Sequence, residues 1–509
     1  MKKITHEFKI KGSRLQSAAK NLSPFALLSH RVAIGGLLIY VIFAPHSVAA
    51  STIGIVVAVV CWLIKSISIR ALEVRRSKFD LIILLSLLWT IASSVFSTEP
   101  RISLPKLTAL WSVLLFYLAR ALVDRRTALL LVGVLILSGV TGVLYSGYDL
   151  LRGRGILVQS LTSVSPLRQL AIQPGDAIWR FAGKRVYSIA ELDEAIKKAP
   201  IQKPLTVSLI SQGEHVERSG LILTAETQRL SSPSGVVGNS RTHRFRASGF
   251  TRHYETFCEL LQMIAQLALG IALANLRNHG ANRYFKFALP AAAILATGIA
   301  FTAMRTVLLA FAIGATVIAW RALRGTPKLV FTVALFLVLG FGAVVVWQTR
   351  GNNAIALGDP SSALRAQVAR IGMSRILIHP LFGHGMDAMH VHWNEWGFPG
   401  TDMLHLHSTP LQLAFDRGLP MLGLWLWLMI AFWLLLSRSS WAATDLSDTN
   451  SYGILLGSLG GLTGFLASSL VNYNYGDTEV AMMFWWLMGI SMAIVESSAG
   501  RGEGGASVA

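Results

Sequence analysis

The sequence predicts an all-α polytopic membrane protein of about 12 transmembrane helices, with a small α/β domain inserted near the middle of the chain. The 509 residues are 53% hydrophobic and only 14% charged, whereas soluble proteins contain about 25% charged residues. Apolar runs of about 17 or more residues recur between residues 31 and 495, and each is long enough to cross a bilayer core. Residues 153–224 contain no such run and have the composition of a compact soluble unit.

The apolar runs define the predicted membrane spans. We place these spans near residues 32–49, 51–69, 80–97, 107–123, 128–147, 257–276, 285–303, 306–321, 328–347, 418–436, 452–471 and 479–495. The first two runs alternatively form one re-entrant pair. Lys and Arg gather in alternate turns between the spans, which places those turns and the N-terminus in the cytoplasm. The long hydrophilic stretches 148–256 and 348–406 then both lie on the outer side.

The predicted topology also sets the division of the chain. It comprises a basic cytoplasmic tail (1–31), membrane helices 1–5 (32–147), a periplasmic α/β domain (153–224), a linker and periplasmic segment (225–256), membrane helices 6–9 (257–347), a large periplasmic loop (348–406), membrane helices 10–12 (407–495) and a cytoplasmic tail (496–509). The first tail is not followed directly by a short apolar stretch with a small-residue cleavage site, so we expect it to be retained rather than removed as a signal peptide.

Charge and cysteine content exclude two classes of function. The formal net charge is +20, but the basic residues lie in short clusters between apolar runs, where they act as topology signals. Nucleic-acid binding would need a continuous basic surface, so we expect no nucleic-acid partner. Cys61 and Cys258 lie far apart in apolar segments and indicate neither a disulfide framework nor a zinc site.

The α/β domain has a recognisable pattern of strands and turns. Strand-like residues 155–161 precede a Pro-Gly turn at 173–176, helix 189–198 follows, and two strand-like runs near 205–211 and 215–223 complete the unit. The run SPLRQLAIQPGDAIWRFAGKRV resembles a bacterial PDZ domain of the type found in periplasmic proteases. That resemblance implies a groove for an extended peptide, bordered by helix 189–198.

A PDZ fold binds a peptide as an added strand and receives its terminal carboxylate on the backbone of a glycine-containing loop. The residues that would form this loop are Arg154, Gly155, Ile156 and Leu157. We therefore expect the domain to recruit a protein C-terminus without taking part in bond making. The alternative is a degenerate groove filled by the chain's own linker.

The large outer loop carries the strongest functional signal. A Pro-x-x-Gly-x-Gly turn follows His379 and ends at Gly385, the pair His407-Ser408 comes next, and a run from Leu411 to Gly418 leads into the tenth span. This pattern resembles the O-antigen ligase and polymerase superfamily, membrane glycosyltransferases of polysaccharide and lipopolysaccharide biosynthesis in the cell envelope. The sequence departs from the family in having Ser408 where Asn is common and Met304 where Ser is common.

Three arginines extend the resemblance. Arg305, in the setting AFTAMRTVLLAF, resembles the family's arginine between two helices, and Arg246 and Arg252 lie in the segment RFRASGFTRHYETF ahead of the sixth span. The predicted topology places these arginines and His407 at the same outer membrane boundary, which independently favours one shared site. The family implies a multi-pass protein of the bacterial inner membrane whose active site faces the periplasm.

The implied reaction transfers a glycan from undecaprenyl diphosphate to an acceptor hydroxyl. Arg305, Arg246 and Arg252 would hold the diphosphate, because guanidinium groups match phosphate oxygens. His407 would act as the catalytic base, since an imidazole that is neutral near pH 7 can take a proton, and His405 and Ser408 would support it. No Asp-x-Asp motif is present, so we expect metal-independent transfer without a cofactor. The expected partners are the lipid-linked donor, an acceptor and membrane lipid.

Several alternatives remain at this point. The acceptor could be lipid, another repeat unit, as in a polymerase, or a protein, as in a protein O-oligosaccharyltransferase. A transporter or a PDZ-containing membrane protease is more remote, because the predicted spans are nearly free of charged residues and no protease motif is visible. His407 could only bond a helix start, Arg305 could be an interfacial anchor, and Arg246 and Arg252 could be loop charges. The remaining histidines of the loop form only a weak zinc pattern.

Overall fold

The computed structural model describes residues 23–71, 76–211, 213–238, 240–251, 253–350, 360–400, 402–442 and 448–502. Within these residues, eleven helical segments are long and apolar enough to cross a membrane, and one further apolar helix, α4 (Asp80–Phe96), is shorter at 17 residues. Together they correspond one to one with the predicted spans. The chain is therefore a multi-pass membrane protein by the length and composition of its helices.

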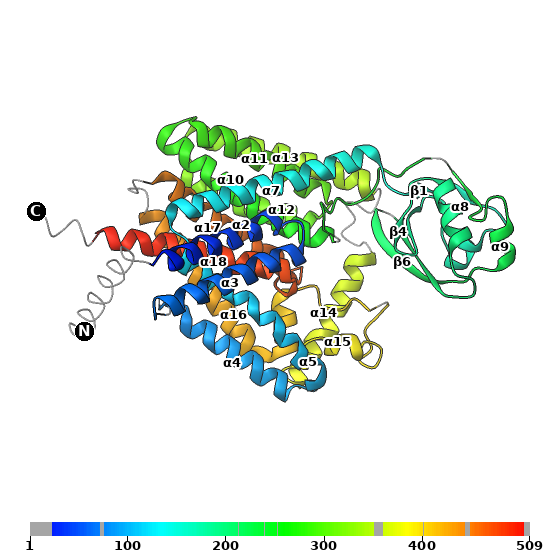
Figure 1. Ribbon diagram of the computed structural model, residues 1–509, viewed down its shortest axis with the longest axis horizontal. Coiled ribbons are helices and arrows are strands. Elements are labelled where there is room, and N and C mark those ends of the chain that lie inside the picture. Colours follow the sequence, from blue (N-terminus) through cyan, green and yellow to red (C-terminus); the bar gives the residue numbers. More distant parts are fainter. Residues whose placement is uncertain are drawn as a thin grey trace, which may run out of the picture.

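The helical body is built from long helices joined mostly by short turns (Figure 1). Its segments besides α4 are α2 (Pro24–Phe43), α3 (Val48–Ser68), a broken segment of α5 (Pro100–Lys106), η2 (Leu107–Val113) and α6 (Leu114–Leu122), then α7 (Arg125–Arg152), α10 (Tyr254–His279), α11 (Arg283–Phe301), α12 (Arg305–Ala322), α13 (Thr326–Arg350), α16 (Thr409–Ala442), α17 (Thr449–Ser469) and α18 (Thr478–Gly502). Both α2 and α3 are long enough to span separately, so the re-entrant alternative is not needed.

Three helix boundaries differ from the prediction for identifiable reasons. The first helix begins at Pro24, where Ser23 caps the chain end and proline supplies the fixed φ of a first helical turn, so it extends into the predicted tail. The fourth segment begins at Pro100 and passes through a 3₁₀ stretch after Pro105, which lacks the amide of a regular helix. The tenth begins at Thr409 and bends at Gly418 (φ 79°, ψ 170°).

Helix α10 is the centre of the body. Its apolar window is wholly buried, and α17 and α18 are mostly buried beside it. Close packing depends on glycine: a Cβ added at Gly270 would lie 2.4 Å from the carbonyl oxygen of Gly453 and from the amide of Gly457. In contrast, α13 buries little of its surface and faces outward. The site described below forms where the start of α10 meets α16 and the loop before α18.

A small α/β unit projects from one end of the helical body, where α14 (Pro360–Ile378) and α15 (Ala388–Val391) also lie (Figure 1). Its main sheet has the order β1-β3-β5-β6, with β4 paired to β3. The sheet strands are β1 (Ile156–Leu157), β3 (Ala177–Phe181), β4 (Lys184–Arg185), β5 (Leu205–Ser211) and β6 (Glu214–Leu221). The α/β unit and the helices α14 and α15, which belong to the two long hydrophilic stretches, thus lie at the same end of the body (Figure 1).

The helix predicted at residues 189–198 is present as α8 (Ile189–Lys198), capped by Ser188, and it packs Leu192 and Ile196 into the unit's apolar core. Part of the predicted linker belongs structurally to the same unit. It forms α9 (Ala225–Arg229) and β7 (Val236–Val237), and β7 pairs antiparallel with β2 (Ser160–Leu161). The chain therefore returns to the α/β unit before it enters α10.

Candidate functional site

The Pro-x-x-Gly-x-Gly turn (residues 380–385) packs against the bend in α16 at Gly418. The amide of Gly385 donates to the carbonyl oxygen of Asp416 at 2.9 Å. Gly418 adopts a left-handed φ of 79°, and a Cβ there would lie 1.7 Å from the carbonyl oxygen of Leu381. The two glycine-containing motifs are thus parts of one contact. This contact fixes the first turns of α16, immediately after His407.

His407 lies at the start of α16 in a left-handed conformation (φ 52°) and contacts His405, with 4.4 Å between ring centroids. The helix start is tied to the loop before α18, because the amide of Thr409 donates to the carbonyl oxygen of Asn472 at 3.1 Å. The Nε2 atom of His407 is buried and has no hydrogen-bond partner in the described part of the chain. Ser408 is buried beside it.

Both histidines are held neutral at pH 7. Burial lowers the pKa of His407 to about 3, with smaller contributions from His405 and Arg365. Burial also lowers the pKa of His405 to about 4, again with a contribution from Arg365. A neutral imidazole can accept a proton, and an anion bound nearby would raise its pKa. His407 would therefore become a stronger base, with a higher pKa, when a negatively charged substrate is bound beside it.

Arg365, on α14, is a site residue that the sequence did not single out. Its charge acts on both His405 and His407 and on Tyr254 at the start of α10. Its Nε atom is buried without a hydrogen-bond partner among the described residues. The sequence places arginines at 365, 370 and 375, and their spacing alone does not distinguish the one that faces the histidines.

Arg246 and Arg305 lie in two different segments that lead into membrane helices, Arg246 ahead of α10 and Arg305 at the start of α12. Arg246 is 2% exposed, lies 2.9 Å from Glu214 and stacks over the Tyr254 ring at 4.3 Å. Arg305 is the first residue of α12, directly before Thr306. Arg252 lies outside the described residues.

A buried carboxylate extends the site into the body. Glu259, one turn into α10, is 3% exposed and accepts hydrogen bonds from Ser468 Oγ at 2.8 Å and from Asn472 Nδ2 at 3.1 Å. Asn472 Nδ2 also donates to Thr306 Oγ1 at 3.3 Å, which links this network to the start of α12. The sequence analysis missed Glu259, although an acidic residue inside an apolar span is a signal of function.

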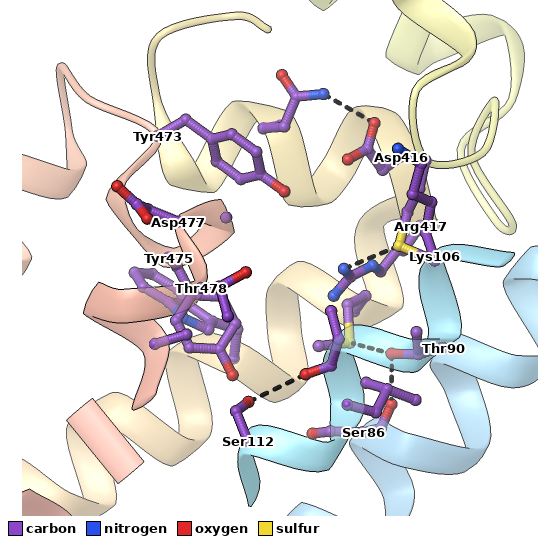
Figure 2. A pocket seen from close by; sticks show the side chains of 18 of the residues that line it. Ser86, Thr90, Lys106, Ser112, Asp416, Arg417, Tyr473, Tyr475, Asp477 and Thr478 are labelled. Atoms are coloured by element: carbon purple, nitrogen blue, oxygen red, sulfur yellow. Dashed lines mark hydrogen bonds between the residues drawn. The ribbon is translucent and has the colours of Figure 1, made fainter. Parts of the chain in front are cut away.

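A cavity of about 620 Å³ opens beside the histidines, between α4, η2, α16 and α18. Its inner wall is largely apolar, with Ile83, Leu87, Val113, Met421, Trp425 and Leu428, and it also includes the hydroxyl groups of Ser86, Thr90 and Ser112 (Figure 2). Its mouth is polar and is formed by Lys106, Asp387, His405, Asp416, Arg417, Tyr473, Asp477 and Thr478. Figure 2 shows Arg417 and Lys106 on one side of this mouth, across from Tyr473 and Asp477.

The cavity mouth carries two cations. Lys106 forms an ion pair with Asp387, and both side chains remain about half exposed. Arg417 donates from Nη2 to the sulfur of Met386 at 3.1 Å, whereas its Nε atom is buried and lacks a hydrogen-bond partner within the described ranges. His405 and Tyr473 also line the small pocket that contains His407 and Glu259. The histidine pair therefore borders the large cavity.

The other loop histidines make local contacts. His392 lies between Glu99 (2.8 Å) and Glu395 (2.5 Å), and His390 pairs with Asp402. His384 bonds the carbonyl oxygen of Arg375 at 3.0 Å. No three of the described His, Cys, Asp and Glu residues are grouped in a way that could hold a metal ion.

Comparison with known families identifies one match to part of the chain. A family model described as O-Antigen ligase matches residues 290–428, about a quarter of the chain. The matched part contains Arg305, Arg365, the turn at Gly385 and both site histidines, whereas Arg246 and the α/β unit lie outside it. A comparison with curated proteins found no match. Over this part the protein is therefore similar to the O-antigen ligases, which supports a ligase-like role in polysaccharide biosynthesis for this multi-pass membrane protein.

Proposed function

We propose that the protein is a metal-independent glycosyltransferase that moves a glycan from undecaprenyl diphosphate to an acceptor hydroxyl at the periplasmic face of the inner membrane. One observation carries the proposal: a neutral histidine pair borders a cavity with a largely apolar lining, and the buried Nε atoms of Arg365 and Arg417 beside it have no hydrogen-bond partner among the described residues. A diphosphate attached to a long hydrocarbon has this combination of charge and apolar surface.

The guanidinium groups supply the charge. The Nε atoms of Arg246, Arg365 and Arg417 are buried, and the described residues provide them with no hydrogen-bond acceptor. A buried donor without a partner costs free energy, about 1–3 kcal/mol and more for a charged group. Phosphate oxygens would satisfy such donors through short, charge-assisted bonds. Arg305 adds a further cation at the start of α12 beside the Asn472–Thr306 contact.

The cavity supplies the apolar surface. Its inner wall continues from the charged mouth along α4 and the part of α16 that follows the bend at Gly418. A polyprenyl chain bound there would place its diphosphate beside Arg417 and Lys106 and its first sugar beside the histidines. Because the cavity volume is about 620 Å³, it would hold the diphosphate end of the carrier, with the remaining isoprene units in the lipid.

His407 is the proposed base. The acceptor oxygen attacks the anomeric carbon of the donor sugar, and its proton passes to Nε2 of His407. The bond between that carbon and the diphosphate oxygen breaks, and its electron pair leaves with undecaprenyl diphosphate. The arginines stabilise the charge that grows on this leaving group. Glu259, Asn472 and the Thr409 contact would keep the helix start in place during the step.

The α/β unit is the proposed PDZ-like domain. Its sheet, the capped helix α8 and the strand that follows a glycine-containing loop support this assignment. The location of the unit and of α14 at one end of the body supports a site on a single membrane face (Figure 1). Within that assignment the acceptor is a lipid, a further repeat unit or a protein hydroxyl.

A reconstituted assay tests the reaction. The purified full chain in lipid would be given a lipid-linked glycan and, separately, a lipid A core, a second lipid-linked repeat unit or a Ser-containing peptide. Transfer with release of undecaprenyl diphosphate to one of them supports the proposal and identifies the acceptor. Failure with all three, in a preparation that binds the donor, would contradict it.

A further inference from the structure

At the position where a PDZ fold would bind a peptide, the α/β unit pairs with a segment of its own chain. Strand β7 pairs antiparallel with β2, so that Val236 lies opposite Leu161 and Val237 opposite Ser160. Backbone bonds extend this pairing on both sides: the amides of Leu157, Gln159 and Thr162 donate to residues 240, 237 and 235, each at 2.9 Å. The described residues 232–238 and 240–242, here called the return segment, thus add a strand to the unit in the way that a bound peptide does.

The return segment also contacts the helix that forms the other wall. The side chain of Val236 is 6% exposed and lies in the apolar cluster that contains Leu192 and Ile196 of α8. Asp193 of the same helix accepts from the amide of Ser234 at 2.8 Å. The segment therefore lies between strand and helix, with one side chain inserted where a peptide's apolar anchor would bind.

The predicted carboxylate loop is also engaged internally. The charge of Arg154 is paired with Asp149, and the side chain is 4% exposed. Its backbone forms an antiparallel bridge with Thr242, with bonds of 2.9 and 3.1 Å. Gly155 is pressed against β3, since a Cβ there would lie 2.7 Å from the carbonyl oxygen of Ile178. A separate C-terminus would have to displace the return segment from both the groove and this bridge.

The return segment leads directly to the site. Four residues after Thr242, the amide of Arg246 donates to the carbonyl oxygen of Gly213 in the β5–β6 turn at 3.1 Å. Glu214 of the same turn lies 2.9 Å from its guanidinium, which stacks on Tyr254 at the start of α10. The α/β unit therefore contacts the chain at two places shortly before α10: β2 pairs with the return segment, and the β5–β6 hairpin binds Arg246.

We propose that the α/β unit is an internal clamp: it binds the return segment of its own chain as an added strand and thereby positions Arg246 against Tyr254, instead of recruiting a separate protein. The pairing of the return segment with β2 and its contacts with α8 stand on the structure alone, whereas the comparison with a peptide groove rests on the PDZ-like assignment proposed above. The benefit to donor binding rests on the role proposed above for Arg246. The unit is thus an accessory of the transfer site in cis, and the return segment is its ligand.

A cross-strand lock separates this proposal from recruitment of a partner. Ser160 and Val237 face each other in the pairing and are exposed, and opposed residues of antiparallel strands lie at a separation that a disulfide can bridge. Oxidised full-length Ser160→Cys/Val237→Cys protein should retain glycan transfer both in vitro and in cells, as should each single variant. Loss of cellular transfer that returns on reduction would show that an external ligand must enter the groove, and would overturn the proposal.

A second experiment releases the clamp. Val236→Asp places a charge in the apolar groove, whereas Val164→Asp, at a position 64% exposed on the same unit, is the matched control. Hydrogen exchange of the amides of Leu157, Gln159 and Thr162 should accelerate at least tenfold in Val236→Asp and remain unchanged in the control. Unchanged exchange in Val236→Asp would overturn the occupied groove, whether or not the protein transfers glycans.

The affinity for the donor then tests whether the clamp positions Arg246. Affinity for undecaprenyl diphosphate should fall in Val236→Asp about as far as in Arg246→Ala. The double variant should bind the donor no more weakly than Arg246→Ala does, because each change removes the same contact between Arg246 and the donor. Fast exchange with unchanged affinity in Val236→Asp would show that the clamp does not position Arg246. If Arg246→Ala also binds normally, the fault lies with the role proposed for Arg246 in the donor site, and the exchange result still decides whether the groove is occupied.

Discussion

Replacement of Arg365 gives the most informative test of the site, because this residue acts on both histidines and was found only from the structure. In Arg365→Gln the diphosphate would lose one or two charge-assisted hydrogen bonds, about 1.5–3 kcal/mol. That loss corresponds to a fall in kcat/KM of about 10- to 150-fold. Arg370→Gln is the matched control, since Arg370 lies on the same helix and is exposed, and it should behave as the wild type.

The pH profile gives an independent readout of the same change. Burial, His405 and Arg365 together lower the pKa of His407. Without the charge of Arg365, the pKa values of His407 and His405 rise. A base must be unprotonated to act, so the acid limb of kcat/KM against pH should move to higher pH in Arg365→Gln. Arg365→Lys keeps the charge and should restore the limb without restoring the full rate, because ammonium cannot form the two-pronged contact.

These measurements are made with purified protein in lipid, a lipid-linked donor and the acceptor identified in the transfer assay. An Arg365→Gln variant with wild-type kcat/KM and an unshifted acid limb would refute the assignment of Arg365 to the site. Equal losses in Arg365→Gln and Arg370→Gln would indicate a general effect of charge on α14 rather than contact with the donor.

Three further predictions concern the base, the phosphate contact and the bend. His407→Ala should reduce turnover by at least 100-fold while the protein still accumulates in the membrane. His379→Ala should retain activity. Transfer by His407→Ala within a few fold of the wild-type rate would show that His407 is not the base. Arg305→Lys should weaken donor binding and turnover together, since a point charge replaces a planar fork, and unchanged values in Arg305→Ala would make the residue an interfacial anchor. Gly418→Ala should destabilise the protein by about 1–3 kcal/mol, because the added methyl group would overlap the carbonyl oxygen of Leu381. Gly423→Ala, where the added methyl group would have no neighbour within 4 Å, should leave the melting temperature the same or higher. Equal changes of the melting temperature in the two variants would contradict the contact at the bend.

The helical body was predictable from sequence because long apolar runs have one common explanation, a membrane span. The turn ending at Gly385 and the pair His407-Ser408 were also visible, since their residue types lie close together in the chain. The predicted ends of the helices were wrong where local backbone chemistry overrides hydropathy. Pro105 interrupts one helix, and Gly418 bends another. Arg252, predicted to hold the diphosphate, stays a prediction.

What the sequence could not provide were contacts between distant segments. Arg365 differs from Arg370 only in which side of α14 it occupies, and the sequence analysis treated the region as a loop. Glu259 becomes part of the site because Ser468 and Asn472 approach it from α17 and the loop that follows it. Strand β7 has only two residues in a Ser- and Gly-rich stretch, so its pairing with β2 depends on the folded groove rather than on local propensity.

The most direct test of the central claim asks where the lipid-linked donor binds. Undecaprenyl diphosphate with a photoreactive group in its first isoprene units would be cross-linked to the reconstituted protein, and the labelled peptides would be identified by mass spectrometry. We predict labelling on α4 and on α16 beyond Gly418, at the cavity wall near Leu87 and Met421, and a marked loss of labelling in Arg417→Ala or with excess unlabelled carrier. Labelling confined to the lipid-facing surface of α13, or unaffected by Arg417→Ala and by the competitor, would contradict the account.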